Sequence, residues 1–346
     1  MHRTPRSRLC ALATWAGLAL AATPSLAATA DDAAVQVRVQ AHVQAAERAA
    51  GEDLKAFLRL CSPAPVNRPT ASDEGLAKLI ATPGPEAAAA FDNLFYLGSG
   101  WVSAWALKTS DGLVLIDALN TAEEVDRLLV GGMRKLGLDP AQVRTLLITH
   151  GHGDHYGGAL RVEALAGPDS PRVVMSDLDW TMTQTQLEFA SPLWPAPPRF
   201  DARRDLAVRD GDRLRQGDAE ILINLTPGHT LGTVSPIFEV RAGDRTHRAV
   251  IWGGTGFNFG RDLARLDAYI ASAERMQRLA REHRVDVLLS NHPSFDATAA
   301  KLRQLAASRP ADAPHPFVVG TETVVRALTV AAECGKANRV RFEQMR

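Results

Sequence analysis

The sequence predicts an α/β or α+β fold in which helices cover layers of β-sheet. Short apolar segments alternate with helical segments between residues 113 and 176, which is typical of parallel strands joined by helices. Further strand-like segments follow one another between residues 220 and 252 and add antiparallel strands to this pattern. No short-period repeat is visible, and 346 residues, 46% of them hydrophobic, suffice for one large domain.

The first residues have the composition of a signal peptide. Arginines near the N-terminus precede an apolar stretch at 9–22, which is too short to span a bilayer comfortably. Small residues then offer cleavage after Ala27 or Ala30. We interpret residues 1–27 as a cleaved export signal. The mature protein is therefore expected in the periplasm, without a membrane anchor, because no later segment is long enough to span a bilayer.

Residues 28–91 are predicted to form an N-terminal extension of helix and loop. Apolar residues recur at helical spacing from Ala33 to Leu60, and a proline-rich loop follows. Removal of the signal peptide would leave Cys61 in this extension and Cys334 near the C-terminus. In an oxidising compartment these cysteines can pair in a disulfide, but two buried free thiols would give the same sequence.

Residues 92–346 are predicted to form the main domain. The helix expected at 121–136 begins at Thr121, a plausible cap, with Glu124 three positions later. Between 180 and 204 the periodicity breaks among aromatic residues and prolines, which indicates either an ordinary connection or a wall or lid over a site. The expected strands lie at 92–97, 102–107, 113–117, 143–148, 172–176, 220–225, 234–240, 247–252 and 285–290, and the other helices at 158–165, 261–282 and 324–336.

The segment 149–158 reads THGHGDHYGG and directly follows the apolar, β-branched strand expected at 143–148. Its glycines let the backbone turn sharply, so that neighbouring side chains can converge instead of alternating outward. Imidazole and carboxylate groups are ligands that zinc prefers, and their density here indicates a metal site. The metal-ligating side chains in this segment are His150, His152, Asp154 and His155.

Two further histidines come directly after predicted strands. His229 follows the strand ILINL, and His292 follows the strand VDVLL. Alone, each histidine would be interpreted as an ordinary turn residue. Together with the segment 149–158 they supply the additional ligands that a two-metal site needs.

The ordered set of these six side chains resembles the metal ligands of the metallo-β-lactamase superfamily over about residues 92–335. The resemblance implies a four-layer αββα sandwich and two Zn²⁺ ions per chain. Subclass B3 is most similar, because the segment after the strand at 247–252 lacks the cysteine of subclasses B1 and B2. It also lacks the bridging aspartate of the glyoxalase II and lactonase branches. By resemblance, zinc 1 would be bound by His150, His152 and His229, and zinc 2 by Asp154, His155 and His292.

The same resemblance implies that a zinc-bound hydroxide opens the amide of a β-lactam, with Asp154 as the catalytic residue that orients it and helps move its proton. Two zinc ions, one carboxylate and one hydroxide leave a charge of about +2, which would attract an anionic small molecule. The sequence GTGFN at 254–258 lacks the serines that often hold the substrate carboxylate in B3 enzymes. The candidate substrate contacts are Thr255, Asn258 and Trp194.

These departures keep two other functions open. The first is a related hydrolase that acts on a lactone, a thioester or another small ester. The second is a non-catalytic zinc-binding member of the fold. The strand at 113–117 also ends in Asp-Ala, where relatives commonly have Asp-Gly. Acidic and basic residues number 39 each, so the charge indicates no nucleic-acid partner, and the sequence leaves the oligomeric state open.

Overall fold

A computed structural model gives the fold of the chain from residue 30 onward, so the signal peptide predicted at 1–27 lies outside the described residues. None of the helices in the described part of the chain has the length and apolar character needed to cross a membrane. The described residues are 30–68, 72–165, 167, 170–308, 310 and 313–345.

Two β-sheets lie face to face among the described residues, and the first has seven strands in sequence order. Its first four strands pair antiparallel through short connections, and β4 to β7 pair parallel. Parallel pairing needs crossover connections, which here contain helices. The carboxyl ends of β4, β5 and β6 therefore meet at one edge. The strands are β1 (Ala88–Phe91), β2 (Leu94–Tyr96), β3 (Trp105–Thr109), β4 (Gly112–Ile116), β5 (Val143–Leu147), β6 (Arg172–Ser176) and β7 (Leu206–Val208).

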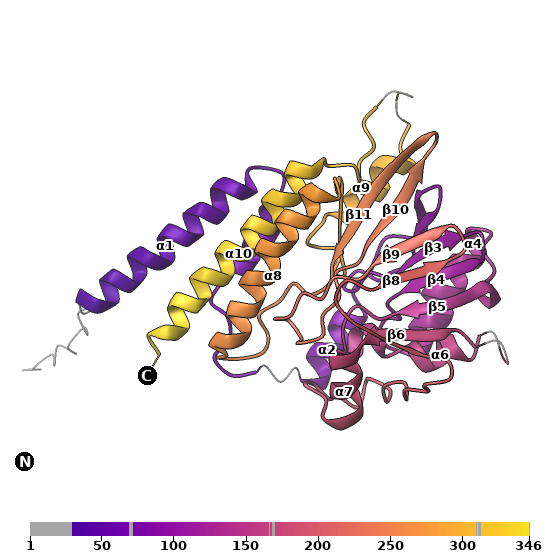
Figure 1. The fold of residues 1–346 in the computed structure, drawn as a ribbon, viewed down its shortest axis with the longest axis horizontal. Coiled ribbons are helices and arrows are strands. Elements are labelled where there is room, and N and C mark those ends of the chain that lie inside the picture. Colours follow the sequence, from indigo (N-terminus) through magenta and orange to yellow (C-terminus); the bar gives the residue numbers. More distant parts are fainter. Residues whose placement is uncertain are drawn as a thin grey trace, which may run out of the picture.

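The second sheet has five strands among the described residues, in the order β12-β11-β10-β9-β8. β11 and β12 are parallel, whereas the other neighbours are antiparallel. β10 and β11 form a long hairpin that is prominent in Figure 1. The strands are β8 (Arg213–Gln216), β9 (Ala219–Leu222), β10 (Ile237–Ala242), β11 (Arg245–Trp252) and β12 (Val287–Ser290).

Side-chain alternation along the strands builds three apolar layers. In β4, Val114 and Ile116 face the second sheet, while Leu113 and Leu115 pack against helices on the outer side. In β11, Ile251 lies between the sheets and Trp252 packs on the opposite side, against helices. Helices therefore cover both sheets, as Figure 1 shows, and the predicted αββα sandwich is confirmed.

The helices on the two outer sides come from different parts of the chain. α4 and α6 cover the first sheet, and α8 and α10 cover the second (Figure 1). Thr121 caps its helix as predicted, since its hydroxyl accepts a hydrogen bond from the backbone N–H of Glu124. The helical segments of the main domain are α3 (Ala122–Glu124), η2 (Val125–Val130), α4 (Gly131–Lys135), η3 (Pro140–Gln142), α5 (Gly153–Tyr156), α6 (Ala159–Glu163), α7 (Asp177–Thr185), α8 (Leu263–Glu282), α9 (Thr298–Ala306) and α10 (Thr321–Glu343).

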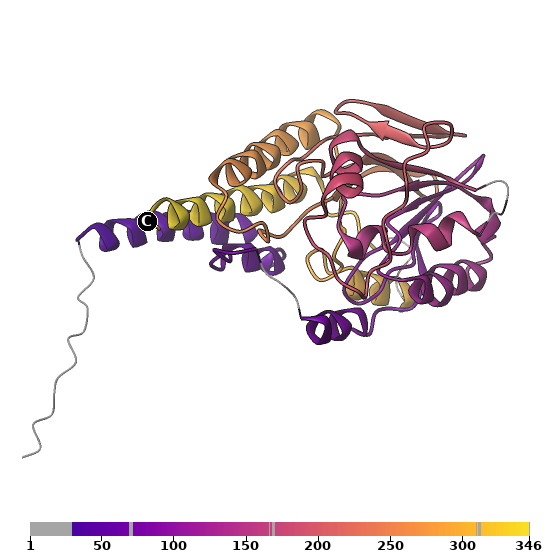
Figure 2. The ribbon, with the colours of Figure 1, turned by 90° about the horizontal axis from the view of Figure 1, so that it is seen from below.

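The N-terminal extension packs along the C-terminal helix. α1 (Ala30–Ala50) runs beside α10 in both Figure 1 and Figure 2. The helix expected from Ala33 to Leu60 is interrupted, because Gly51 adopts a φ of 53° and ends α1. A short turn of 3₁₀-helix, η1 (Lys55–Cys61), then precedes α2 (Asp73–Ile80). Cys61 and Cys334 form a disulfide, which joins η1 to α10.

Several elements differ from the prediction. α7 extends to Thr185, so the irregular segment begins later than the expected residue 180. The final helix is longer than predicted, and β1, β7, β8, α2, α7 and α9 were not anticipated. β7 and β8 have exposed residues that give little apolar signal. β1 begins at Ala88, before the domain boundary expected at residue 92.

Candidate metal centre

Six potential metal ligands meet where strand-end loops of both sheets converge. The turn after β5 carries His150 to His155, and its last residues form the short helix α5. His229 lies in the loop between β9 and β10, and His292 directly follows β12. The two sheets therefore contribute to one site, although the ligands span residues 150 to 292.

The first group of ligands contains only imidazoles. His150, His152 and His229 are each almost fully buried, and potential ligand atoms of all three lie within 4.8 Å of one another. The Nε2 atoms of His150 and His229 are 3.1 Å apart. Neighbouring ligand nitrogens of a tetrahedral zinc ion have a comparable separation, since each Zn–N bond is about 2.0–2.1 Å. We refer to these three residues as the histidine set.

Hydrogen bonds on the outer side of each ring determine which nitrogen faces the centre. His229 donates from Nδ1 to the carbonyl oxygen of Gly256 at 2.8 Å, which leaves Nε2 as an acceptor. His152 instead contacts Glu188 Oε2 through Nε2 at 3.2 Å, so its Nδ1 is the free nitrogen. His150 Nδ1 lies 3.3 Å from the hydroxyl of Thr149, which can accept its proton. Such outer contacts fix the tautomer and orientation of metal-bound histidines.

The second group of ligands contains a carboxylate. Oδ2 of Asp154 lies 3.3 Å from Nε2 of His155 and 3.8 Å from Nε2 of His292. On their outer sides, His155 donates from Nδ1 to Asp117 at 2.8 Å, and His292 donates from Nδ1 to the carbonyl of Trp101 at 2.8 Å. We refer to Asp154, His155 and His292 as the aspartate set.

Electrostatics at the aspartate set favour a bound cation. Burial acts to raise the pKa of Asp154, but His155 and His292 lower it overall, so the carboxylate is charged. Burial acts to lower the pKa of His155, but the carboxylates of Asp154 and Asp117 raise it to about 10. Burial and the other imidazoles lower the pKa of His150, which keeps that ring neutral.

The donor atoms fit zinc. His155 Nε2 is buried and has no hydrogen-bond partner within the described residues. A metal ion would satisfy this atom, and neutral imidazole and carboxylate groups are the ligands that zinc takes. The structure thus brings together all six side chains selected from the sequence.

Two buried aspartates hold the ligand loops in place. Asp117, at the end of β4, accepts hydrogen bonds from the backbone N–H and the hydroxyl of Thr149 at 2.7 and 2.9 Å. Asp179, on α7, accepts from the backbone N–H of Gly151 at 2.8 Å and from the hydroxyl of Thr230 at 2.8 Å. Asp179 therefore joins the turn after β5 to the loop of His229.

Close backbone packing explains the glycines at the end of the metal-binding segment. A Cβ atom on Gly157 would lie 2.0 Å from the carbonyl oxygen of Asn120, and one on Gly158 would lie 2.1 Å from that of Ala118. The chain after β4 adopts positive φ angles at Asp117 and Leu119, both 61°, but not at Ala118. The Asp-Ala departure from relatives therefore leaves this turn intact.

The irregular segment after α7, residues 186–204, forms one wall of the site, and we refer to it as the wall segment. Glu188 contacts His152, and its carboxylate also accepts two hydrogen bonds from Arg265 on α8, at 2.7 and 3.1 Å. Phe189 packs edge-on against the ring of His152, with centroids 4.9 Å apart. Trp194 covers Gly153, where a Cβ atom would lie 2.2 Å from the indole. The wall expected between 180 and 204 is therefore built by the part of the segment that follows α7.

A cleft of about 560 Å³ opens over the ligands, and its walls are mainly apolar and aromatic. The three predicted substrate contacts all line it. Trp194 donates its indole N–H to Asn120 at 3.0 Å, Thr255 is buried, and Asn258 has a side-chain oxygen without a hydrogen-bond partner in the described residues. The lining residues are Arg59, Leu76, Leu79, Thr82, Gly100, Trp101, His152, Asp154, Phe189, Trp194, His229, Thr255, Gly256, Asn258, His292, Ser294 and Phe295.

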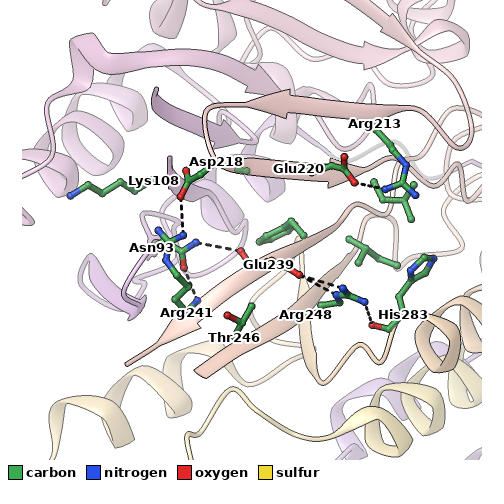
Figure 3. A pocket seen from close by; sticks show the side chains of 14 residues that line it. Asn93, Lys108, Arg213, Asp218, Glu220, Glu239, Arg241, Thr246, Arg248 and His283 are labelled. Atoms are coloured by element: carbon green, nitrogen blue, oxygen red, sulfur yellow. Dashed lines mark hydrogen bonds and ion pairs between the residues drawn. The ribbon is translucent and has the colours of Figure 1, made fainter. Parts of the chain in front are cut away.

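A second hollow lies over the second sheet, away from these ligands (Figure 3). Its charged side chains largely neutralise one another. Arg241 pairs with Asp218 at 3.0 Å, and Arg248 pairs with Glu239 at 3.4 Å. The hollow lacks the cluster of buried imidazoles that characterises the first cleft, and we assign it no chemistry.

Sequence reasoning missed the residues that support the ligands. Asp117 could have been found, because it ends a predicted strand next to the metal-binding strand. Asp179, Glu188 and Arg265 gave no such signal, because each contacts a partner 28 to 77 residues away in the chain.

Comparisons with known proteins agree with this geometry. Residues 98–241 match the model of the family described as the Metallo-beta-lactamase superfamily. Among curated proteins, the acyl-coenzyme A thioesterase MBLAC2 of Bos taurus is 25% identical over 215 residues, which cover 57% of this chain and 75% of that protein.

Solved structures match over a larger part of the chain. BJP-1, a subclass B3 metallo-β-lactamase of Bradyrhizobium japonicum, has a TM-score of 0.57 and 25% identity, and the match covers 72% of this chain and 92% of that one. The FEZ-1 metallo-β-lactamase of Legionella gormanii has a TM-score of 0.64 and 21% identity, over 76% and 98% of the two chains. The resemblance expected from the sequence is thus confirmed.

Proposed function

From the metallo-β-lactamase fold of this chain, we propose that the protein is a zinc-dependent hydrolase of the subclass B3 kind that opens the amide of a β-lactam. The observation that carries this proposal is the pair of ligand sets at a cleft of about 560 Å³, since the atoms of the histidine set lie within 4.8 Å of one another and Asp154 lies 3.3 and 3.8 Å from the imidazoles of His155 and His292. A cleft of this size suits a small, drug-sized substrate.

Each ligand set would hold one zinc ion. Zinc bound there would polarise a substrate carbonyl and lower the pKa of water, which supplies a nucleophile at neutral pH. The outer contacts of His229 and His292 orient these rings, and burial lowers the pKa of both, so that their inward nitrogens are unprotonated and available for this role.

The chain's own side chains would bind the substrate and move the proton. The charged carboxylate of Asp154 lines the cleft and would orient water and accept its proton. Phe189, Trp194 and Phe295 would pack against the apolar parts of the substrate and exclude bulk water. Thr255 and Asn258, which also line the cleft, would supply polar contacts.

A second candidate function is hydrolysis of a thioester or another small ester. Its support is the match to an acyl-coenzyme A thioesterase, together with the absence of serines from the stretch 254–258. The same ligand sets would serve both reactions, because each begins with attack of water on a carbonyl carbon. An experiment must therefore determine which of the two classes of substrate the protein hydrolyses.

A substrate panel with measured zinc content tests the proposal. We expect the zinc-loaded protein to hydrolyse a chromogenic cephalosporin and carbapenems faster than lactones or thioesters. Intact β-lactams alongside cleaved thioesters would replace the first function with the second. A protein that holds no tightly bound zinc and cleaves none of these compounds would be a non-catalytic member of the fold.

We also propose that the protein acts in the periplasm on a small anionic substrate. The support is the export signal at 1–27 and the excess positive charge that two zinc ions would bring to the cleft. Fractionation of cells that express the full chain should find the mature protein in the periplasmic fraction. Recovery of an uncleaved chain from the cytoplasm would contradict this location.

A further inference from the structure

The N-terminal extension places a cation at the rim of the cleft. Arg59 lies in η1 and is the only lysine or arginine among the described residues that line the cleft. Its neighbours Ser294 and Phe295 come shortly after the ligand His292. Arg59 therefore lies near the aspartate set in space, although it is distant in sequence from every metal ligand.

Arg59 is held in place by several contacts. Its Nε donates to the carbonyl of Ala56 at 3.0 Å, and Nη2 donates to the hydroxyl of Ser294 at 3.0 Å. The guanidinium carbon lies 4.2 Å from the centroid of the Phe295 ring, which orients the guanidinium plane by a cation–π contact. An oriented arginine loses less side-chain entropy when a ligand binds.

The backbone of η1 is anchored as well. The disulfide joins Cys61 to Cys334 on α10, and Arg341 donates to the carbonyl of Cys61 at 2.8 Å. Asn338 donates to the carbonyl of Leu60 at 3.0 Å. Arg59 therefore lies on a rigid support and not on a free terminal segment.

The charge of Arg59 is not balanced by the protein. No aspartate or glutamate in the described residues forms an ion pair with it, in contrast to Arg265, which pairs with Glu188. Burial alone lowers the pKa of Arg59, whereas a nearby carboxylate would raise it. Both its Nη1 hydrogens and the second Nη2 hydrogen remain available, which suits bidentate binding of a carboxylate.

We propose that Arg59, supplied by the N-terminal extension, binds the anionic group of the substrate and determines the preference of this hydrolase for anionic substrates. The inference rests on the proposed function. In a β-lactam the anionic group is a carboxylate, and in an acyl-coenzyme A it is a phosphate. The stretch 254–258 lacks the serines that often hold the substrate carboxylate in B3 enzymes, and Arg59 would hold the anionic group in their place.

Matched pairs of substrates test the proposal. The first pair is a chromogenic cephalosporin acid and its methyl ester, and the second is an acyl-coenzyme A and the neutral acyl-N-acetylcysteamine thioester. For Arg59→Gln we expect KM to rise about 10-fold for the anionic member of the hydrolysed pair, since hydrogen bonds to charged groups have this strength. The kcat should change little, and the neutral member should be unaffected.

Two further variants serve as controls. Arg59→Lys keeps the charge without the two-pronged geometry, so its KM should lie between those of the wild type and Arg59→Gln. Arg48→Gln removes the same charge from exposed α1, outside the cleft, and should leave KM unchanged. Zinc content and the thermal midpoint of each variant establish that the fold is retained.

The possible outcomes separate this inference from the proposed function. If Arg59→Gln changes KM equally for the anionic and neutral members, or changes neither, the inference is overturned while the hydrolase assignment stands. If the wild type hydrolyses no member, the assignment fails, and calorimetric binding of the cephalosporin acid and its ester to the protein decides the inference. Equal affinity of the wild type for acid and ester would then overturn it.

Discussion

The two ligand sets of the metal centre are supported in different ways. The aspartate set is supported from the protein core, where Asp117, with a side chain 2% exposed, binds His155. The histidine set depends on the wall segment after α7, where Glu188, with a side chain 13% exposed, binds His152. One carboxylate ends a strand in the middle of a sheet, whereas the other lies in a segment without regular structure.

This difference indicates that the two ligand sets respond differently to changes in the surrounding structure. Asp117 has little freedom to move, because β4 is paired on both sides up to Ile116 and the backbone N–H of Asp117 donates to the carbonyl of Leu147 at 2.9 Å. Glu188 depends instead on its two hydrogen bonds from Arg265 and on packing of the surrounding loop. Changes in the wall segment should therefore disturb His152 before they disturb His155.

Loss of a ligand should have the largest effect. In His152→Ala we expect hydrolysis of any substrate to fall by roughly 10³-fold or more, because the histidine set loses one of its three imidazoles. Zinc content, measured by atomic absorption, should fall toward one ion per chain. His283→Ala, in the hollow of Figure 3, is the matched control and should behave as the wild type. Full activity of His152→Ala would refute the assignment of the histidine set.

Removal of the core support should have the next largest effect. In Asp117→Asn we expect zinc affinity at the aspartate set to fall about 10- to 100-fold, because His155 loses the partner that orients it. Competition with a chromophoric chelator measures this affinity. Asp111→Asn, at the other end of β4, removes an exposed carboxylate and is the control. Equal zinc affinity in the two variants would contradict a supporting role for Asp117.

Removal of the support in the wall segment should have a smaller effect on the other set. In Glu188→Gln we expect a loss of about 10-fold in zinc affinity, because the neutral amide still contacts His152 and Arg265. The same chelator competition should assign the loss to the histidine set. Glu282→Gln, at the exposed end of α8, is the control. If zinc affinity fell only at the aspartate set, Glu188 would not be the support of the histidine set.

The smallest expected effect concerns stability in acid. Burial acts to raise the pKa of Glu188, but hydrogen bonds from His152 and Arg265 lower it from 4.5 to about 2. A lowered pKa in the folded state stabilises the fold above the unfolded pKa, and this contribution is lost as the pH falls from 4.5 toward 2. Urea denaturation of metal-free protein should therefore show the wild type losing its advantage over Glu188→Gln across that range. If the difference in the free energy of unfolding between the two proteins stayed constant across that range, the charged contact of Glu188 with His152 and Arg265 would not contribute to stability.

The sequence predicted the ligands better than their supports. Ligands follow strands, and the strand at 143–148 has a clear apolar and β-branched pattern, so His150 to His155 could be placed at a sheet edge. Glu188 is one acidic residue among many, and only the folding of the wall segment brings it to His152. The disulfide could not be decided for the same reason, since Cys61 and Cys334 are 273 residues apart.

Short-range effects also limited the prediction. Helical periodicity continues across Gly51, but its left-handed conformation ends α1 and allows η1 to turn toward the cleft. That turn is what places Arg59 at the rim. Composition and periodicity give no indication of this placement, because it depends on the packing of η1 against α10.

The turn after β4 carries a cost that has consequences for how this protein could evolve. Asp117 and Leu119 both have left-handed φ angles, which are unfavourable for residues other than glycine. Glycine at position 117 would relieve this strain, but it would remove the carboxylate that orients His155 and would leave the buried N–H and hydroxyl of Thr149 without their acceptor. A replacement at this position therefore has two demands to meet, because the residue must tolerate a left-handed φ and must also carry the carboxylate that joins the end of β4 to the turn after β5.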